Sequence, residues 1–237
     1  MASIVRLFVN APLDRGQGIT LTDQAHYLAN VMRLGAGDVI HVFNGRDGEW
    51  AARIDAASRK RVELTVEAQT KPLQMPPDLW LLFAPIKKAR TDFIVEKAAE
   101  MGAARICPVQ TDFTNSERIR QDRLQAHAIE AAEQCGGTYV PEVTKLQKLG
   151  KLLDDWPADR QLMFCDERMV GQSPALPENG GPWAILIGPE GGFSDTERKR
   201  LHALPYAHAV SLGPRILRAD TAAVAALTVW QQQLGDW

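Results

Sequence analysis

The chain has 237 residues, of which 45% are hydrophobic and 24% charged, and its formal net charge is −2. These values are typical of a globular protein with one large domain or two smaller ones, and they exclude a strongly basic nucleic-acid-binding chain. The sequence has no run of about 20 apolar residues and no secretory pattern at its first residues, so we expect a cytoplasmic protein without a membrane span.

The cysteines and histidines do not form a metal-binding pattern. Cys107, Cys135 and Cys165 are isolated from one another and odd in number, which is typical of neither a disulfide framework nor a Cys-x-x-Cys metal clip. The five histidines are not spaced as His-x-His or His-x-x-x-His pairs. We therefore expect no bound metal.

The first seventy residues contain short apolar segments, the last of which alternates with polar residues at the period of a half-buried strand. The segment 44–48, Asn-Gly-Arg-Asp-Gly, is a strong hairpin signal, and one helix is expected from about residue 22 to Arg33. This pattern predicts a small β-barrel domain over 1–71, followed by a proline-rich linker over 72–77. The expected strands are 4–9, 39–43, 49–54 and 61–67.

From residue 78 the pattern changes to apolar strands separated by helices. This alternation predicts a mostly parallel sheet covered on both faces, so we assign 78–237 to one α/β domain. The expected strands are 79–84, 105–109, 162–165, 183–187 and 208–212. One expected helix follows the first of these strands and ends at Met101, and two others span 121–134 and 221–234.

A glycine-rich loop, Gly-Pro-Glu-Gly-Gly at 188–192, follows the expected strand 183–187. Ser194 and Glu197 fit a capping box, which places the loop between a strand end and a helix start. Glycine lets a ligand approach the backbone, and open α/β sheets bind ligands at the carboxyl ends of their strands. The loop has neither a Walker A ending nor a dinucleotide fingerprint, and a tight turn without a ligand is the alternative.

A second loop, Leu-Gly-Pro-Arg-Ile-Leu-Arg at 212–218, follows the expected strand 208–212. It carries Arg215 and Arg218 three residues apart, and a plain connector with surface arginines is the alternative. Asp220 and Thr221 are candidate N-cap residues for the last helix. Two such loops within the last fifty residues predict one composite ligand site.

The segments LIGPEGGFSDTE and SLGPRILRADTAA together resemble the C-terminal signature of the RsmE family, the bacterial small-subunit rRNA uracil-N3 methyltransferases of the SPOUT superfamily. DFIVEKAAEMG, starting at Asp92, and the N-terminal RLFV and HYL…VMR segments resemble the same family. The resemblance implies an α/β fold, with a SPOUT-type parallel sheet and a C-terminal trefoil knot after a small PUA-like β-barrel domain. It also implies S-adenosylmethionine as cofactor and methylation of uridine N3 in 16S rRNA on the assembled small ribosomal subunit.

Three segments depart from the family pattern. Asp220 stands where many relatives carry Glu, Gly136-Gly137-Thr138 stands where an arginine is common, and the segment 111–118 is altered. The last two departures concern RNA contacts more than cofactor binding.

The resemblance also implies roles for single residues. We expect Arg218 to stabilise the developing uracil anion, and Glu190 or Asp220 to accept or orient the N3 proton. A plain helix cap is the alternative for Asp220. Cofactor binding is expected at Leu186, Ile187, Gly188, Pro189, Glu190, Gly191, Leu212, Gly213, Ile216 and Leu217.

RNA binding is expected from clustered basic residues, for which a solvated surface is the alternative. The last helix carries small residues that suit either a homodimer contact or an internal core. Two other functions stay open: a methyltransferase acting on another RNA position, such as the ribose 2′-O, and a non-catalytic RNA-binding ribosome-assembly factor. The RNA-binding candidates are Arg6, Arg33, Arg59, Lys60, Arg61, Lys87, Lys88, Arg90 and Arg215.

Overall fold

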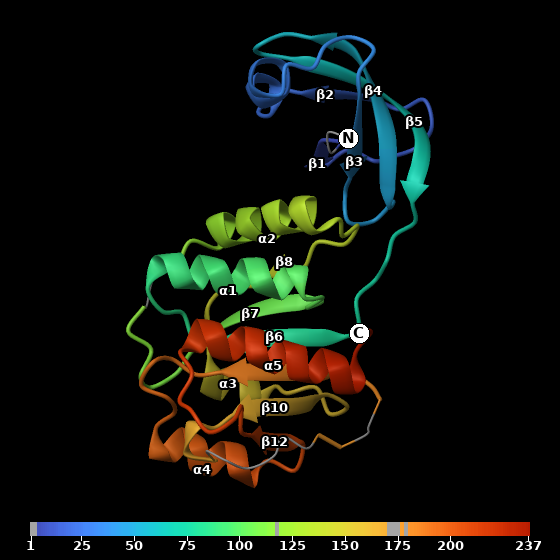
Figure 1. The fold of residues 1–237 in the computed structure, drawn as a ribbon. Coiled ribbons are helices and arrows are strands. Elements are labelled where there is room, and N and C mark those ends of the chain that lie inside the picture. Colours follow the sequence, from blue (N-terminus) through green and yellow to red (C-terminus); the bar gives the residue numbers. More distant parts are fainter. Residues whose placement is uncertain (1–3, 117–118, 170–175, 178–179) are drawn as a thin grey trace. The chain divides into compact units, whose positions relative to one another are not determined.

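The computed structural model describes residues 4–116, 119–169, 176–177 and 180–237 (Figure 1). Glu117 and Arg118, which end the altered segment 111–118, lie outside the described residues. The chain forms two compact units, one of residues 1–75 and 132–140 and the other of residues 76–131 and 141–237. Residues 132–140, expected from the sequence in the second domain, pack with the first unit.

The first unit contains a five-stranded sheet in the order β1-β3-β4-β5-β2, in which β1 and β3 are parallel and the other pairs antiparallel. Alternate side chains such as Ile40, Val42 and Leu64 are fully or almost fully buried in its core. Strand β2 is not among the strands expected from the sequence, and its four residues include a glycine. The strands are β1 (Arg6–Phe8), β2 (Gly18–Leu21), β3 (Val39–Phe43), β4 (Glu49–Ala57) and β5 (Val62–Lys71).

The helix expected up to Arg33 is shorter than predicted. Helical backbone covers residues 25–31, most of it the π-helical turn η1 (Tyr27–Val31). Arg33 follows with φ 57°, a left-handed backbone that is uncommon outside glycine, so the chain turns away directly after η1.

The second unit is built on a parallel sheet, as predicted, in the order β12-β10-β11-β6-β7-β8, with β9 paired to β7. The predicted strands lie within two residues of the observed ones, whereas the short β8, β9 and α3 carry no clear periodic pattern. The strands are β6 (Leu79–Phe83), β7 (Arg105–Gln110), β8 (Glu142–Val143), β9 (Gln147–Lys148), β10 (Gln161–Cys165), β11 (Trp183–Ile187) and β12 (Ala207–Val210). The helices are α1 (Lys88–Glu100), α2 (Gln121–Cys135), α3 (Leu149–Asp154), η2 (Glu167–Met169), α4 (Asp195–Ala203) and α5 (Ala219–Leu234).

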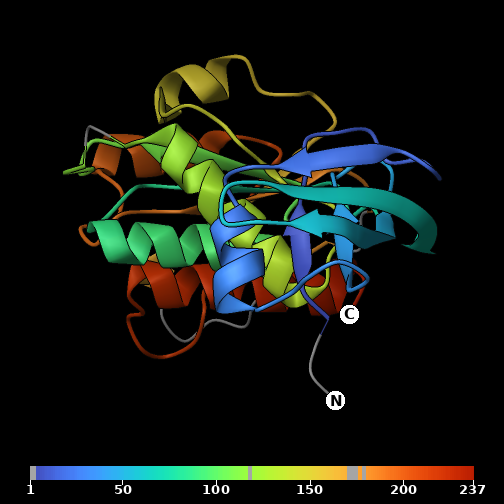
Figure 2. The same cartoon turned by 90° about the horizontal axis from the view of Figure 1, so that it is seen from above.

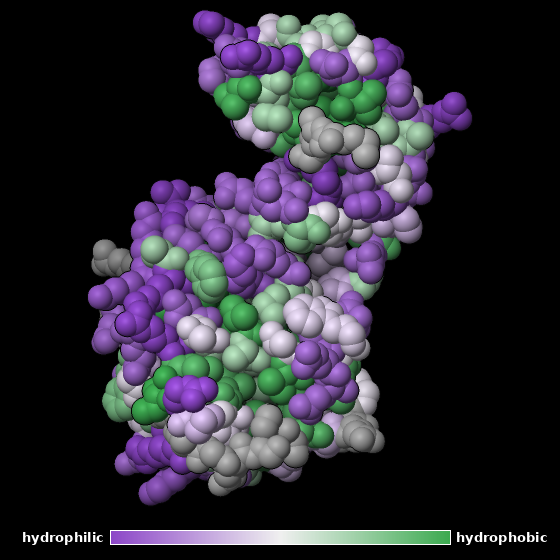
Figure 3. Space-filling view, viewed as in Figure 1, coloured by the Kyte–Doolittle hydropathy of each residue, from purple (hydrophilic) through white to green (hydrophobic). Residues whose placement is uncertain are grey.

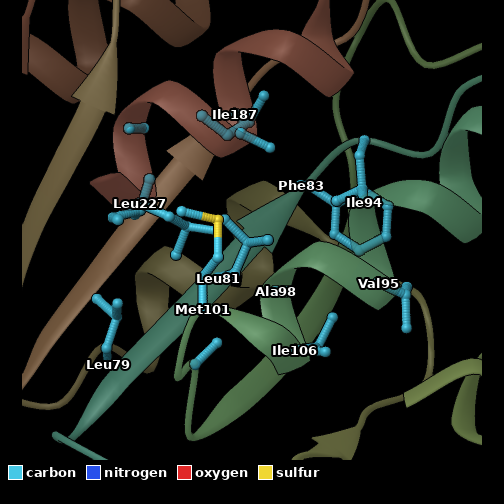
Figure 4. Close-up of a cluster of buried hydrophobic side chains, with 14 of the residues drawn as sticks. Leu79, Leu81, Phe83, Ile94, Val95, Ala98, Met101, Ile106, Ile187 and Leu227 are labelled. Carbon is cyan, nitrogen blue, oxygen red and sulfur yellow. The ribbon is translucent and has the colours of Figure 1, made fainter. Parts of the chain in front are cut away.

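Both faces of this sheet are buried, which explains why its strands are continuously apolar. Helices α1 and α5 lie side by side on one face (Figures 1 and 2), where Leu81 and Phe83 of β6 pack against Ile94 and Leu227 (Figure 4). The intervening Leu82 points to the other face, into a second core. The outer surface of α1 and α2 is hydrophilic, and hydrophobic residues gather on the lower part of this unit (Figure 3).

The ends of the last two helices differ in how they are capped. The predicted capping box of α4 is confirmed: the Glu197 N–H donates to Ser194 Oγ (3.2 Å), and the Ser194 N–H donates to Glu197 Oε2 (3.0 Å). The predicted caps of α5 are wrong, because its N-cap is Arg218, whose side chain makes no capping hydrogen bond. Asp220 instead lies in the first turn, where a carboxylate interacts favourably with the helix dipole.

Candidate cofactor pocket and catalytic residues

A pocket of about 290 Å³ lies at the carboxyl ends of the adjacent strands β12, β10 and β11. Each strand continues directly into pocket residues, and the start of α5 completes the wall. This is the edge at which open α/β sheets bind ligands. The lining residues are Cys165, Asp166, Ile187, Gly188, Pro189, Glu190, Gly192, Val210, Ser211, Leu212, Gly213, Arg215, Ile216, Leu217, Arg218, Ala219 and Ala222.

The structure brings eight of the ten predicted cofactor residues into this lining. The two exceptions are Leu186 and Gly191. The Leu186 side chain is fully buried in the core on the opposite face of the sheet, next to Leu82. Gly191 lies beside Phe113, whose ring and Cβ would be 3.4–3.7 Å from an added Cβ at position 191. Neither residue therefore contacts the pocket.

The backbone of both loops is suited to hold a ligand. Within the described part of the chain, the N–H groups of Leu212, Gly213 and Leu217 donate no hydrogen bond. Gly213 has φ 106°, a conformation that side-chain-bearing residues rarely adopt. In the first loop, a Cβ at Gly188 would lie 3.2 Å from the buried Phe193 ring, so glycine allows this loop to pack closely. The pocket thus combines unpaired backbone donors with a largely apolar wall.

A buried carboxylate that the sequence analysis missed also forms part of the wall. Asp166 follows β10 and is 3% exposed. It pairs with Arg198 of α4, its Oδ2 lies 3.1 Å from His202 Nε2, and its Oδ1 accepts the Arg168 N–H at 3.0 Å. Burial lowers the pKa of the Arg198 guanidinium. The available signal was an acidic residue directly after a buried strand.

The predicted catalytic residues occupy different positions relative to the pocket. Arg218 and Glu190 both line it, and among the described residues the exposed Arg218 side chain makes no hydrogen bond or ion pair. Asp220 is outside the lining. Arg90, at the start of α1, joins the two carboxylates: its Nη1 donates to Glu190 Oε1 at 2.7 Å, and its Nε lies 3.7 Å from Asp220 Oδ2.

The predicted RNA contacts are partly engaged within the protein. Arg6 is almost buried, since its Nε donates to Glu49 Oε2 at 2.5 Å and its other nitrogens to the carbonyls of Ala132, Glu133 and Gly137 at 2.6–2.8 Å. These bonds attach 132–140 to the first unit, so we remove Arg6 from the RNA-binding candidates. Arg90 is paired as described above, and Arg61 lies 2.9 Å from Glu63. The remaining candidates are exposed: Arg33, Arg59, Lys60, Lys87, Lys88 and Arg215.

Comparisons with known proteins agree with this arrangement. Residues 73–231 match the model of an RNA methyltransferase domain, and residues 21–67 match an RNA methyltransferase PUA domain. Ribosomal RNA small subunit methyltransferase E from Synechocystis is 32% identical over 88% of this chain and 71% of its own length. The chain belongs to the RsmE family of RNA methyltransferases.

Three more similar proteins match along nearly their whole length. The enzyme from Rickettsia conorii is 28% identical over 94% of this chain and 93% of its own. A methyltransferase structure from Legionella pneumophila, in complex with S-adenosylmethionine, has a TM-score of 0.90 at 27% identity and covers 100% of both chains. The RsmE structure from Neisseria gonorrhoeae, bound to the same cofactor, has a TM-score of 0.89 at 27% identity and covers 99% of this chain and 100% of its own.

Two further findings concern metals and membranes. The described residues contain no group of three or more His, Cys, Asp or Glu side chains placed to hold a metal ion. None of the described helices has the length and apolar character needed to cross a membrane.

Proposed function

We propose that this RsmE-family protein methylates N3 of a uridine in 16S rRNA with S-adenosylmethionine, acting as a homodimer on the assembled small ribosomal subunit. The observation that carries the proposal is the pocket formed by the two loops 187–192 and 210–218, whose backbone donors are unpaired among the described residues. The chain's family membership and its likeness to two structures holding this cofactor support the same function.

The pocket residues fit the proposed cofactor. An adenine ring has apolar faces and polar edges, and the pocket offers Val210 and Leu217 side chains beside the N–H groups of Leu212 and Gly213. A sulfonium cation is favoured near a carboxylate, and Glu190 lies in the lining. When bound, S-adenosylmethionine supplies an electrophilic methyl group on this positively charged sulfur.

Backbone groups of both loops bind the cofactor in this proposal. We assign the adenine and ribose to the backbone of Ile187, Gly188, Leu212 and Leu217, which face one cavity from two adjacent loops. The apolar wall excludes water and fixes the ring, so that binding energy orients the reacting groups. Orientation alone accounts for about 7–11 kcal/mol of barrier reduction in well-placed reactions.

The reaction must remove a proton, because uracil N3 is protonated and weakly nucleophilic at neutral pH. Glu190 accepts this proton while N3 forms its bond to the methyl carbon, and a positioned base contributes about 10²–10⁴-fold. Arg218, whose guanidinium is unpaired among the described residues, stabilises the negative charge that develops on the uracil oxygens. Asp220 lies outside the pocket lining, so we assign it an orienting role through Arg90.

The larger architecture is part of the proposal. We infer a PUA-like barrel domain at 1–71, a linker at 72–77 and a SPOUT domain at 78–237 with a C-terminal trefoil knot, in which residues 132–140 pack with the first unit. The placement of β10 between β12 and β11 is compatible with such threading. On α5, Ala226 is buried in its own core whereas Ala225 and Val229 remain partly exposed, which leaves a face of small residues for a second copy. The exposed Arg33, Arg59 and Lys60 are the proposed rRNA contacts of the first unit.

Methyl transfer from labelled S-adenosylmethionine to unmodified small ribosomal subunits tests this function, with nucleoside mass spectrometry of the digest. N3-methyluridine is the expected product. A 2′-O-methyl product would instead indicate a methyltransferase that acts on the ribose, and cofactor binding without any transfer would indicate a non-catalytic ribosome-assembly factor.

The role of Arg218 has its own test. Its side chain makes no capping bond, so Arg218→Ala leaves α5 intact, abolishes transfer and leaves cofactor affinity nearly unchanged. Arg120→Ala is the matched control, because Arg120 is 75% exposed and, among the described residues, its side chain pairs only with the exposed Asp122. Loss of cofactor affinity together with transfer would contradict the assignment.

A further inference from the structure

Three charged side chains from distant parts of the chain meet beside the cofactor pocket. Arg90 comes from the first turn of α1, Glu190 from the loop after β11, and Asp220 from the first turn of α5. We propose that Arg90 is a positioning residue that holds Glu190 in place for proton removal, and that it is not an RNA contact. This inference rests on the proposed methyl transfer and deepens it.

Arg90 is the group that fixes the Glu190 carboxylate. The Glu190 side chain is 53% exposed and extends from a loop, and among the described residues its side chain pairs only with Arg90. A free side chain of this length samples many rotamers, so its carboxylate would be in the reactive position for only part of the time. The charge-assisted hydrogen bond of 2.7 Å to Oε1 restricts that sampling.

Asp220 in turn orients Arg90. Its Oδ2 lies 3.7 Å from Arg90 Nε, while its Oδ1 accepts the Thr221 N–H at 3.0 Å. The planar guanidinium addresses the two carboxylates with different nitrogens, which the single ammonium of a lysine cannot do in the same geometry. The position of Glu190 is therefore set from α5 through Arg90.

The geometry also separates the two Glu190 oxygens by role. Arg90 holds Oε1, so Oε2 is the atom that accepts the N3 proton. As N3 forms its bond to the methyl carbon, the electron pair of the broken carbon–sulfur bond stays on sulfur, and the proton passes from N3 to Oε2. No other reactant is needed.

The same surroundings make Arg90 a poor phosphate contact. Its side chain is 28% exposed and faces two carboxylates, which would repel an approaching phosphate. Its neighbours Lys87 and Lys88 are exposed and, among the described residues, have no side-chain partner. The basic cluster at the start of α1 therefore combines two lysines that are accessible to RNA with one arginine that is engaged by carboxylates.

A double-mutant cycle on kcat tests the inference, with N3-methyluridine as product and with cofactor and RNA saturating. We expect Glu190→Gln to lower kcat about 10²-fold or more and Arg90→Lys to lower it about tenfold. If Arg90 acts through Glu190, adding Arg90→Lys to Glu190→Gln changes kcat by less than about twofold. Multiplication of the two single effects would overturn the proposal.

RNA affinity gives a second readout. Arg90→Ala should leave the salt dependence of RNA binding unchanged, whereas loss of one phosphate contact lowers the slope by about 0.7–0.9. A lower slope, with KM raised and kcat intact, would overturn the positioning role. Arg120→Ala is the matched control, because it removes an exposed arginine of the same protein.

Two measurements separate this inference from other failures. Cofactor affinity and thermal stability should match those of the wild type in Arg90→Lys, because an ion pair this exposed adds little to stability. A large loss of either would mean that Arg90 supports the fold, and would overturn the proposal. Wild-type protein that binds cofactor but makes no N3-methyluridine would instead contradict the proposed function, and this inference with it.

Discussion

The buried ion pair of Asp166 and Arg198 predicts how much the free energy of unfolding falls when its cation is removed. Replacing Arg198 by Met removes the cation and keeps an apolar stem of similar length. The Asp166 carboxylate, which is 3% exposed in the wild type, then keeps His202 and the Arg168 N–H as its partners among the described residues. The variant therefore leaves a buried charge that is only partly compensated.

Removing one partner of a buried ion pair costs about 3–5 kcal/mol. We expect the lower end, about 3 kcal/mol, because the His202 ring nitrogen and the Arg168 N–H stay within hydrogen-bond distance of the carboxylate. For a domain of this size, each kcal/mol lowers the Tm by about 2–4 °C. The expected loss in Tm is thus about 6–12 °C. Cofactor affinity should fall as well, because Asp166 lines the pocket.

Urea unfolding followed by circular dichroism measures the loss, and isothermal calorimetry measures the cofactor affinity. Arg198→Met with Asp166→Asn is the control, since the neutral amide removes the unpaired charge. The double variant should be more stable than Arg198→Met alone by about 1 kcal/mol or more. A single variant within about 1 kcal/mol of wild type would show that the buried charge carries no such penalty, and so would a double variant no more stable than the single one.

Two further variants test the cofactor loop and the first unit. Gly213→Ala forces a side-chain-bearing residue to φ 106°, which costs about 1–3 kcal/mol of backbone strain. Calorimetry should therefore show a cofactor affinity about 5- to 150-fold weaker, whereas the control Gly35→Ala, with open space around its added Cβ, should leave the cofactor affinity unchanged. The other variant is Glu49→Gln. Burial raises the pKa of Glu49, but hydrogen bonds from Arg6 and Thr70 outweigh burial, so its pKa lies below the ordinary 4.5. The ionised carboxylate therefore stabilises the fold above pH 4.5, and this contribution is lost as the pH falls through the lower folded-state pKa. Glu49→Gln should be less stable at pH 7 and lose less stability on acidification; an acid-unfolding profile as steep as that of wild type would contradict this account.

Local sequence patterns predicted most of the second unit. The strand 183–187 and the capping box of Ser194 and Glu197 were predicted correctly, because their signals lie within a few neighbouring residues. Eight of the predicted cofactor residues line the pocket, because the two loops that contain them are also marked by neighbouring residues in the sequence. Leu186 was misplaced because successive strand residues face opposite sides of the sheet, and the apolar run does not show which side holds the ligand.

The residues that were missed or misassigned depend on partners far away in the sequence. Arg90 meets Glu190 across 100 positions, and Arg6 meets the Ala132 carbonyl across 126. A basic residue in a cluster looks the same whether it faces solvent, RNA or a distant carboxylate. Asp166 was missed for the same reason, since its side-chain partners Arg198 and His202 lie on α4 and no spacing rule connects them.

The late position of the pocket in the chain has a consequence during translation. Every lining residue lies between Cys165 and Ala222, and β10 pairs with β11 on one side and β12 on the other. A nascent chain that has extruded β11 but not β12 exposes β10 as an unpaired apolar edge. Such a chain has no complete pocket, so cofactor cannot stabilise it by binding. Prematurely terminated products ending before Ala207 should therefore aggregate or be degraded, whatever the cellular supply of cofactor.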